Sequence, residues 1–361
     1  MTSRMDHAGR RERLRAVAAE RGLDAVLVTD LLNVRYLTGF TGSNGAFLLR
    51  TDGTDLFGTD GRYTTQAGTQ VPDVELVVDR STVAALAGAA AGVGRLGYES
   101  HVVTVDGLRA LEQAAEGVEL VSVRRAVEAL RAVKDPDEVE ALRRACTVAD
   151  QALAELAAEG ALRPGRTELA VGRELDARML ALGAEAPSFE TIVAAGANSA
   201  IPHHRPDGTE LRGGDFLKLD FGATVDGYHS DMTRTVVLGH PAAWQTEVYA
   251  LVRESQAAGR AALAVGADVT AVDAASRDVI AAAGHAEHFT HGLGHGVGLE
   301  IHEAPGISAL GAGTLAAGMA VTVEPGVYLP GHGGVRIEDT LIVTDGEPEL
   351  LTLTSKELLV L

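Results

Sequence analysis

Short apolar runs alternate with amphipathic stretches through the first 125 or so residues. Arg10 to Arg21 has the polar and apolar spacing of an amphipathic helix. Runs typical of buried strands occupy residues 25–29, 46–49, 55–57, 74–78 and 95–98. The second and third runs flank Asp52-Gly53, a pair that favours a tight hairpin. The pattern predicts a small mixed α/β domain.

A charged stretch from Val127 to Asp135 leads into a strong helix start. Asp135 can cap a helix, Pro136 suits its first turn, and Glu138 stands at the capping-box position. A long helix is therefore expected from Pro136 to about Glu159. The same break places the boundary between an N-terminal domain of residues 1–128 and a C-terminal domain of residues 129–361.

In the C-terminal domain, helical and strand patterns come in blocks. Further helices are expected at residues 167–182, 247–264 and 269–283, and strands at 216–220, 234–238 and from 319 onward. Blocks of this kind, in place of strict alternation, are typical of an α+β domain.

Composition limits the classes of function. The 361 residues carry a net charge of −19, which would repel nucleic acid. The single cysteine, Cys146, excludes an internal disulfide and a thiolate metal cluster; it lies in a helical pattern, fits a reducing cytoplasm, and is expected to be a buried structural thiol. No apolar stretch is long enough to span a membrane, and residues 1–20 lack the apolar centre of a signal peptide.

Two aspartates flank a predicted hairpin. If Asp226-Gly227 forms its loop, Gly222 lies opposite Asp231, and Asp220 shares the face of Gly222. The two aspartates are then diagonal neighbours, about 7–8 Å apart at the backbone, which two cations could bridge. An ordinary solvated hairpin with two surface aspartates explains this segment equally well.

Residues 291–302 contain three histidines and four glycines. A dinucleotide-binding turn would need a preceding strand and a following helix, and neither pattern is present. A zincin helix would need a glutamate directly after the first histidine, and Gly292 stands there. The remaining interpretation is a group of imidazoles that line a pocket, one of them on a metal.

Two glutamates complete the set of candidate ligands. Glu324 ends an apolar run and is followed by Pro325-Gly326, so it should point into polar surroundings. Alternation puts Arg336 and Glu338 on one face of an extended segment, where they could also form a plain ion pair. Four carboxylates and one imidazole are the donors that a pair of hard divalent cations needs for hydrolysis.

Together these motifs resemble the pita-bread metallopeptidases, most closely the Xaa-Pro peptidases aminopeptidase P and prolidase. The matching segments are 220–223, 227–234, 291–299, 323–328 and 334–339. Residues 33–42 and 59–63 are similar to the creatinase-type N-terminal domain of that family, and residues 134–139 to its junction helix. The resemblance implies a pita-bread catalytic domain preceded by a smaller creatinase-like domain.

The resemblance also implies the site. Its metal ligands fall on Asp220, Asp231, His295, Glu324 and Glu338, which would hold two divalent ions, manganese before cobalt or zinc. Its substrate-site residues fall on His203 (preferred over His204), His291 and His302, with Glu324 as proton shuttle and Arg336 supporting a ligand carboxylate.

The implied activity is hydrolysis of the peptide bond before proline in small peptides. We take an Xaa-Pro aminopeptidase as the first expectation and an Xaa-Pro dipeptidase (prolidase) as the alternative. A metal-free creatinase-like hydrolase, a non-catalytic binding relative and a methionine aminopeptidase fit less well, because all five ligands are present and an N-terminal domain precedes them. The resemblance further implies a homodimer or higher homo-oligomer, and the composition a cytoplasmic protein.

Overall fold

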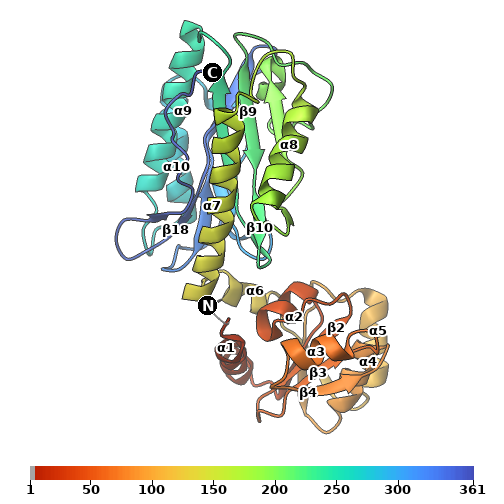
Figure 1. The fold of residues 1–361 in the computed structure, drawn as a ribbon. Helices are drawn as coiled ribbons and strands as arrows, with labels where there is room; N and C mark the ends of the chain where they lie inside the picture. The colour runs from red at the N-terminus through yellow and green to blue at the C-terminus, as the bar shows by residue number, and fades with distance from the viewer. Residues whose placement is uncertain (1–4) are drawn as a thin grey trace. The chain divides into compact units, whose positions relative to one another are not determined.

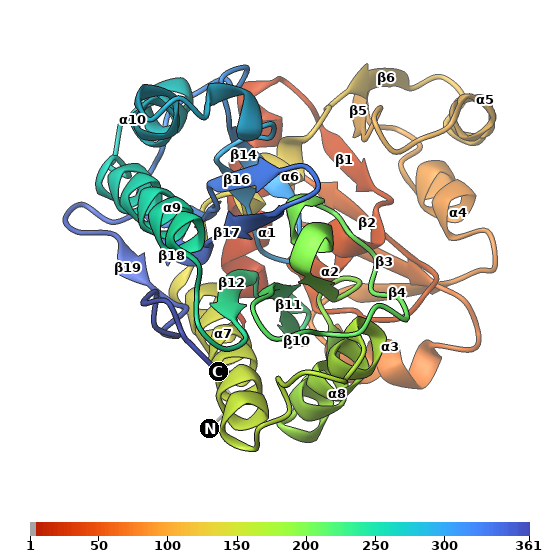
Figure 2. The same ribbon diagram turned by 90° about the horizontal axis from the view of Figure 1, so that it is seen from above.

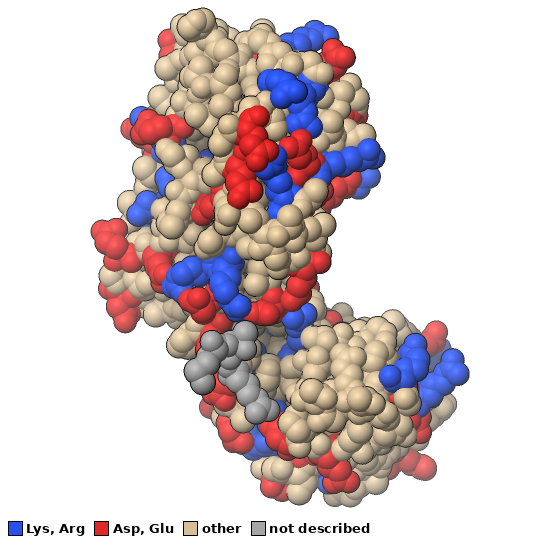
Figure 3. All heavy atoms as spheres, in the orientation of Figure 1, with Lys and Arg blue, Asp and Glu red and all other residues tan. Residues whose placement is uncertain are grey.

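The computed structural model describes residues 5–361, so the first four residues of the N-terminal stretch lie outside the described part. The chain forms two compact units, which divide between Arg131 and Ala132. Figure 1 draws the first unit in red to gold and the second in yellow to blue. Figure 3 shows acidic and basic side chains interspersed on the visible face of each unit. Within residues 5–361, no helix has the length and apolar character to cross a membrane.

A six-stranded mixed sheet forms the centre of the N-terminal unit. Its order is β4-β3-β2-β1-β5-β6, with β1–β2 and β2–β3 antiparallel and the other neighbours parallel. The strands are β1 (Ala25–Val28), β2 (Gly45–Arg50), β3 (Leu56–Thr59), β4 (Glu75–Val78), β5 (Arg95–Tyr98) and β6 (Glu119–Ser122). The helices are α1 (His7–Glu20), α2 (Leu31–Thr38), α3 (Thr64–Gln70), α4 (Thr82–Ala89), α5 (Val105–Ala114) and α6 (Ala126–Arg131). The predicted mixed α/β domain and its β2–β3 hairpin are confirmed.

A buried polar cluster joins β1, α2 and β5 in this unit. Glu99 is 2% exposed and accepts hydrogen bonds from the backbone N–H groups of Thr29 and Asp30. It also accepts one from Asn33 Nδ2 at 2.7 Å, and Asn33 Oδ1 accepts one from Arg131 Nη1 at 2.9 Å. Burial raises the pKa of Glu99 above its usual value. Asn33, part of the creatinase-like motif, therefore has a structural role here.

The helix α7 (Pro136–Ala158) opens the C-terminal unit as the sequence predicts. Asp135 Oδ1 accepts the N–H of Glu138, and Glu138 Oε2 accepts the N–H of Asp135, each at 3.0 Å. This reciprocal capping box satisfies two backbone donors that a helix start leaves unpaired. Cys146 lies on the buried face of α7, and burial raises the pKa of its thiol. The expected structural thiol is confirmed.

Two pairs of helices flank the strands of the C-terminal unit. α7 packs beside α8 (Glu168–Ala181), and α9 (Ala243–Ala261) packs beside α10 (Val269–Ala282). Figure 2 shows the two pairs on different sides of the central strands. One apolar cluster joins α7 and α8 to the strands β8 (Ile192–Ala195), β9 (Phe216–Phe221) and β12 (Met232–Val237). Another joins α9 and α10 to β14 (Glu303–Ile307), β15 (Ala320–Val323) and their neighbours. Two short 3-10 helices, η1 (Gly196–Ala200) and η2 (Ala286–His288), lie between these elements.

The strands of this unit form four small sheets. Their orders are β11-β10-β7, β12-β9-β8, β14-β13-β15-β18-β19 and β16-β17. The strands are β7 (Ala186–Pro187), β8 (Ile192–Ala195), β9 (Phe216–Phe221), β10 (Ala223–Val225), β11 (Tyr228–His229), β12 (Met232–Val237), β13 (Gly294–Gly296), β14 (Glu303–Ile307), β15 (Ala320–Val323), β16 (Gly326–Leu329), β17 (Gly333–Arg336), β18 (Asp339–Ile342) and β19 (Glu349–Leu350). Backbone and side-chain hydrogen bonds join β12 to the β17–β18 segment. The strands that precede α9 in the sequence therefore contact the strands that follow α10.

Candidate metal centre

Asp220 and Asp231 come from the hairpin that Asp226-Gly227 closes. β9 and β12 pair with Asp220 opposite Thr233, which is the register predicted from the turn and puts Asp231 diagonally across from Asp220. Both carboxylates are buried and line the same cavity. The alternative of a solvated hairpin with two surface aspartates is therefore wrong.

His295 enters the cavity from β13, where glycines allow close backbone approach. A Cβ at Gly294 would stand 2.0 Å from Thr322 O, and one at Gly296 would stand 2.2 Å from Ala304 O. His295 Nδ1 lies 3.0 Å from Gly296 O and donates to it. That hydrogen bond fixes the tautomer and leaves the Nε2 lone pair free for a metal. The segment is a strand, so the zincin helix is excluded for these residues.

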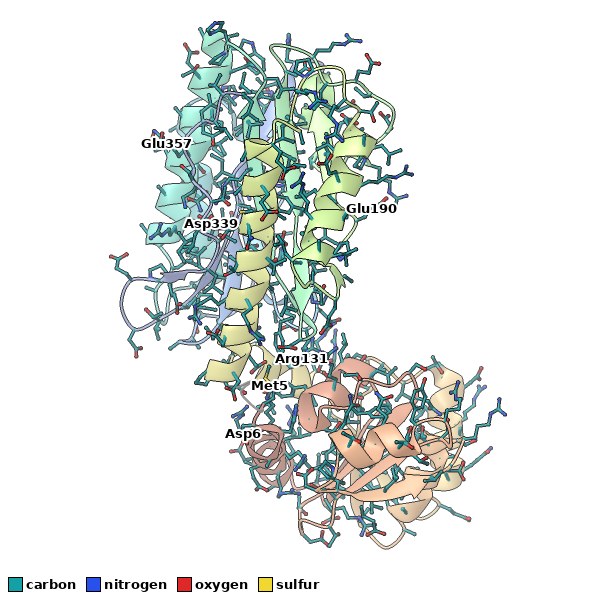
Figure 4. All side chains as sticks on the ribbon, in the orientation of Figure 1. Met5, Asp6, Arg131, Glu190, Asp339 and Glu357 are labelled. Carbon is teal, nitrogen blue, oxygen red and sulfur yellow. The ribbon has the colours of Figure 1, made fainter. Side chains whose placement is uncertain are left out.

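Glu324 and Glu338 approach the cavity from the ends of β15 and β17. Ile337 points to the opposite side, into the apolar core, as alternation predicts. Glu338 Oε2 accepts a hydrogen bond from Thr233 Oγ1 at 2.7 Å. The next residue, Asp339, lies among the strands (Figure 4) and accepts hydrogen bonds from Arg234 and Lys356, which holds the backbone that presents Glu338.

These donors converge on one point and fit divalent cations. Ligand atoms of Asp231, His295 and Glu338 lie within 4.8 Å of one another, and His295 Nε2 is 3.5 Å from both Asp231 Oδ2 and Glu324 Oε1. Asp220 Oδ1 is buried and has no hydrogen-bond partner among the described residues. A buried carboxylate oxygen without a partner is costly unless a cation completes it. The donor set is therefore chemically suited to divalent metal ions.

Electrostatics point the same way. Burial, followed by repulsion from neighbouring carboxylates, raises the pKa values of Asp231 and Glu338 well above their usual range. Burial is also the main cause that raises the pKa of Glu324 to about 8 and lowers the pKa of His295 to about 4. The protein alone thus gathers carboxylates that resist ionising together and an imidazole that stays neutral, an arrangement that positive charge would stabilise.

Arg336 connects this cluster to a second set of hydrogen bonds. Its guanidinium is buried, pairs with Asp220 Oδ2, and donates to Tyr328 Oη at 2.8 Å. His291 Nδ1 donates to Gly292 O at 2.8 Å, so its Nε2 accepts from Tyr328 Oη, also at 2.8 Å. Tyr328 therefore links Arg336 to His291. The sequence motif contained Tyr328, but its role depends on partners from other segments and was missed.

The two other predicted histidines, His203 and His302, line the cavity without such hydrogen bonds. The cavity has a volume of about 420 Å³. His302 stacks edge-on against His295, with ring centroids 4.5 Å apart. Neither His302 nor His203 has a hydrogen-bond partner among residues 5–361, and both are exposed to the cavity side. The structure thus brings together all nine predicted site residues, which are Asp220, Asp231, His295, Glu324, Glu338, His203, His291, His302 and Arg336.

Comparison with known proteins defines the class. Residues 140–345 match the model of metallopeptidase family M24, and residues 10–133 match the creatinase/prolidase N-terminal domain. The chain belongs to metallopeptidase family M24. The divalent metal ions that this family implies agree with the carboxylate and imidazole cluster. The expected combination of a creatinase-like domain and a pita-bread catalytic domain is confirmed.

Individual relatives match over nearly their whole length. An Xaa-Pro dipeptidase of Pyrococcus horikoshii is 34% identical over 342 residues, which cover 94% of this chain and 95% of that protein. A solved Xaa-Pro dipeptidase from Bacillus anthracis has a TM-score of 0.92 at 39% identity, over 99% of this chain and 100% of that one. A solved X-Pro aminopeptidase from Thermotoga maritima has a TM-score of 0.88 at 32% identity, over 95% of this chain and 99% of that one.

Proposed function

We propose that this protein is a metal-dependent Xaa-Pro peptidase. The observation that carries the proposal is the convergence of five metal donors on one cavity, with Asp220 Oδ1 buried and unpaired. The proline specificity is proposed because the relatives described above are named Xaa-Pro dipeptidases. The test is turnover of Xaa-Pro peptides by purified protein, before and after exhaustive chelation. Full activity without metal would contradict the proposal and favour the metal-free creatinase-like alternative.

Five residues are proposed to hold two divalent cations, and they are Asp220, Asp231, His295, Glu324 and Glu338. Four of the five are carboxylates, so manganese is the preferred ion, with cobalt and zinc as alternatives. Cations in this position supply Lewis-acid activation of a water molecule and of the scissile carbonyl. Elemental analysis of the protein as purified, followed by reloading with each metal in turn, identifies the ion. Binding of a single equivalent would contradict the two-ion proposal.

The side chains around the cations have separate roles in this proposal. His302 and His203, whose ring nitrogens are unengaged, hydrogen-bond the substrate carbonyl and its neighbours. Glu324 takes the proton of the attacking water and returns it to the prolyl nitrogen as the carbon–nitrogen bond breaks. His291 has both nitrogens engaged within the protein, so it shapes the wall of the pocket. Arg336 orients Asp220.

Between the two Xaa-Pro activities, we now place the dipeptidase first. The relatives favour the dipeptidase. The two Xaa-Pro dipeptidases described above are 34% and 39% identical to this chain, whereas the solved X-Pro aminopeptidase is 32% identical. This reverses the order expected from the motifs alone. An Xaa-Pro dipeptide assayed beside an Xaa-Pro-Yaa tripeptide decides the question, because cleavage of the tripeptide at an equal or higher rate would restore the aminopeptidase.

One feature of the cavity supports the dipeptide. Arg205 lines the cavity, and its side chain is 84% exposed and forms a solvent-exposed ion pair with Glu190 at 3.2 Å. Arg336, by contrast, is buried and occupied. Arg205 is thus a cation that could meet the free carboxylate of a dipeptide. We expect Arg205→Ala to raise KM for an Xaa-Pro dipeptide more than for its C-terminal amide; an equal rise for both would contradict this role.

The cellular setting is also a proposal. A single buried cysteine is consistent with the cytoplasm. Family analogy supports a homodimer or larger homo-oligomer, and analytical ultracentrifugation of the full chain measures it directly. A monomer at micromolar concentration would contradict that part.

A further inference from the structure

The segment that carries His203 is anchored by polar groups that are not metal ligands. We define residues 195–207 as the His203 loop. Because the His203 ring has no hydrogen-bond partner among residues 5–361, its position follows from the backbone that carries it. Whatever holds this loop therefore sets where His203 points.

Glu168 gathers one side of the loop. It is the first residue of α8, and its side chain is fully buried. Its Oε1 accepts the N–H of Ala195 at 2.7 Å and Asn198 Nδ2 at 3.0 Å. Its Oε2 accepts His204 Nε2 at 2.7 Å and the N–H of Asp207 at 3.4 Å. Four donors spread along the loop thus meet on a single carboxylate.

Lys218 holds the residues just before His203. Its Nζ donates to the carbonyl oxygen of Ile201 at 2.7 Å and to that of Pro202 at 3.2 Å. Arg336 Nη1 also donates to Pro202 O, at 3.2 Å. His203 is therefore bracketed, with its preceding carbonyls held on one side and the ring of His204 held by Glu168 on the other.

A third metal site is the rival explanation for this cluster. Glu168, His204 and Asp207 offer ligand atoms close enough for an ion. Each oxygen of Glu168 already accepts two hydrogen bonds, however, and Asp207 Oδ1 accepts the N–H of Thr209 at 2.7 Å. An ion would have to displace these donors, so the contacts favour a hydrogen-bonded anchor.

We propose that Glu168, acting through His204, is a positioning residue that aims His203 at the substrate. The inference rests on the proposed function, in which His203 contacts the substrate. Misplacement of such a group by about 1 Å can cost on the order of 100-fold in rate. The second histidine of the His203-His204 pair thereby gains a role of its own, separate from the chemistry.

Matched variants test the anchor. Glu168→Gln keeps the shape of the side chain but replaces one acceptor oxygen with a donor. His204→Gln keeps an N–H donor near the position of Nε2, whereas His204→Phe removes it. Asp176→Asn serves as the control, because Asp176 lies on the same helix and accepts its hydrogen bond from Thr191 Oγ1 at 2.5 Å instead.

We expect Glu168→Gln and His204→Phe each to lower kcat about 10- to 100-fold. Metal content should stay at the wild-type level in both. His204→Gln and Asp176→Asn should keep most of the activity. Wild-type kcat in both anchor variants, or loss of a metal equivalent from Glu168→Gln, would overturn the proposal. If Glu168→Gln does not fold, the pair of His204 variants gives the same comparison.

A double-mutant cycle separates positioning from general structural damage. If Glu168 works through His203, Glu168→Gln should cost nothing further in a His203→Ala background. Additive losses would overturn the proposal. Full activity of His203→Ala would instead show that the assumed role of His203, and with it the proposed function at this residue, is wrong. Nitrogen NMR of the imidazoles gives a readout independent of turnover, since the His204 Nε2 resonance should shift when Glu168→Gln replaces its carboxylate partner.

Discussion

Single side chains around the cavity divide into those already held by the protein and those left open. Arg336, Tyr328 and His291 are linked by successive hydrogen bonds. His302 has none among residues 5–361, and Asp220 Oδ1 is buried without one. The open groups are the ones that a substrate or a cation would complete, so their substitution should affect chemistry more than folding.

His302→Ala should lower kcat by about 100-fold while metal content stays unchanged. The physical reason is loss of a hydrogen bond to the oxygen that gains charge in the transition state. Steady-state kinetics with elemental analysis on the same preparation measures both quantities. Loss of metal from His302→Ala would mean that this histidine belongs to the ligand set.

Asp231→Ala and Glu338→Ala should abolish activity together with metal binding. Each removes a buried carboxylate whose oxygen lies within 4.8 Å of ligand atoms from the other and from His295. Each substitution also relieves repulsion between carboxylates. The melting temperatures of the metal-free variants should therefore be at least as high as that of the metal-free wild type. Retention of both metals with activity lost would contradict the ligand assignment.

Glu99→Gln should change how stability depends on pH. Burial raises the pKa of Glu99, so the folded state keeps this proton to higher pH than the unfolded chain does. The contribution of Glu99 is therefore fully present below its unfolded pKa of about 4.3 and is lost as pH rises through its folded pKa. Urea unfolding at several pH values should show the wild type losing stability relative to Glu99→Gln as pH rises from 4. A constant difference would contradict the shifted pKa.

Residue roles were predictable where a motif fixed both the residue and its neighbours. The hairpin turn at Asp226-Gly227 was enough to place Asp220 beside Asp231, because the register follows from the turn. Lys218 and Tyr328 could not be found in this way. Their partners, the carbonyl of Pro202 and the guanidinium of Arg336, come from segments whose proximity depends on the whole fold.

At the scale of elements, β13 is a strand in which two of three positions admit only glycine without a backbone shift. Gly294 and Gly296 flank His295, and neighbouring backbone carbonyls occupy the space that a side chain would need. Gly306, which pairs with His295 from β14, has nothing within 4 Å of an added Cβ. Adjacent glycines on paired strands thus differ sharply in tolerance.

Gly294→Ala should weaken metal binding, because its methyl group would push β13 away from Thr322 O and move His295. Gly306→Ala is the matched control and should bind metal normally. Titration of the metal-free proteins with manganese, monitored by calorimetry, compares their affinities for the ion. Equal affinities in the two variants would contradict the tight packing around β13.

Element prediction succeeded for long, capped helices and failed for short ones. The capping pattern of Asp135, Pro136 and Glu138 predicts the start of α7, and the helix begins at Pro136. α4 is built from Ala, Gly, Val, Leu and Thr with no polar face, so its periodicity carries no signal. The strand order β4-β3-β2-β1-β5-β6 could not be predicted either, because local sequence patterns do not specify which distant strands pair.

For the C-terminal unit as a whole, the metal centre lies where two packed halves meet. Asp220 and Asp231 lie on or beside β9 and β12, which contribute to the apolar cluster with α7 and α8. Glu324 directly follows β15, which contributes to the cluster with α9 and α10, and His295 lies on β13, which pairs with β15. Bound cations would therefore tie the two halves together. Their removal should therefore lower the stability of the entire C-terminal unit against unfolding.

Chelation should lower the melting temperature of the protein, and manganese should restore it. A ligand at 100 times its Kd stabilises the folded state by about 2.7 kcal/mol per site. Differential scanning calorimetry at several manganese concentrations measures the shift, and the Asp231→Ala variant is the control. A melting temperature that does not respond to metal in the wild type would contradict a centre shared by both halves.

The ion pair between Arg336 and Asp220 has a consequence for how the enzyme acquires its cofactors. Since a buried guanidinium already orients one acidic ligand, that group needs no partner protein to set its direction, and we expect ions to be captured directly from solution. The composition of the surrounding ion pool, more than any assembly step, then decides which element occupies the centre. Growth conditions should accordingly alter the metal recovered from cells.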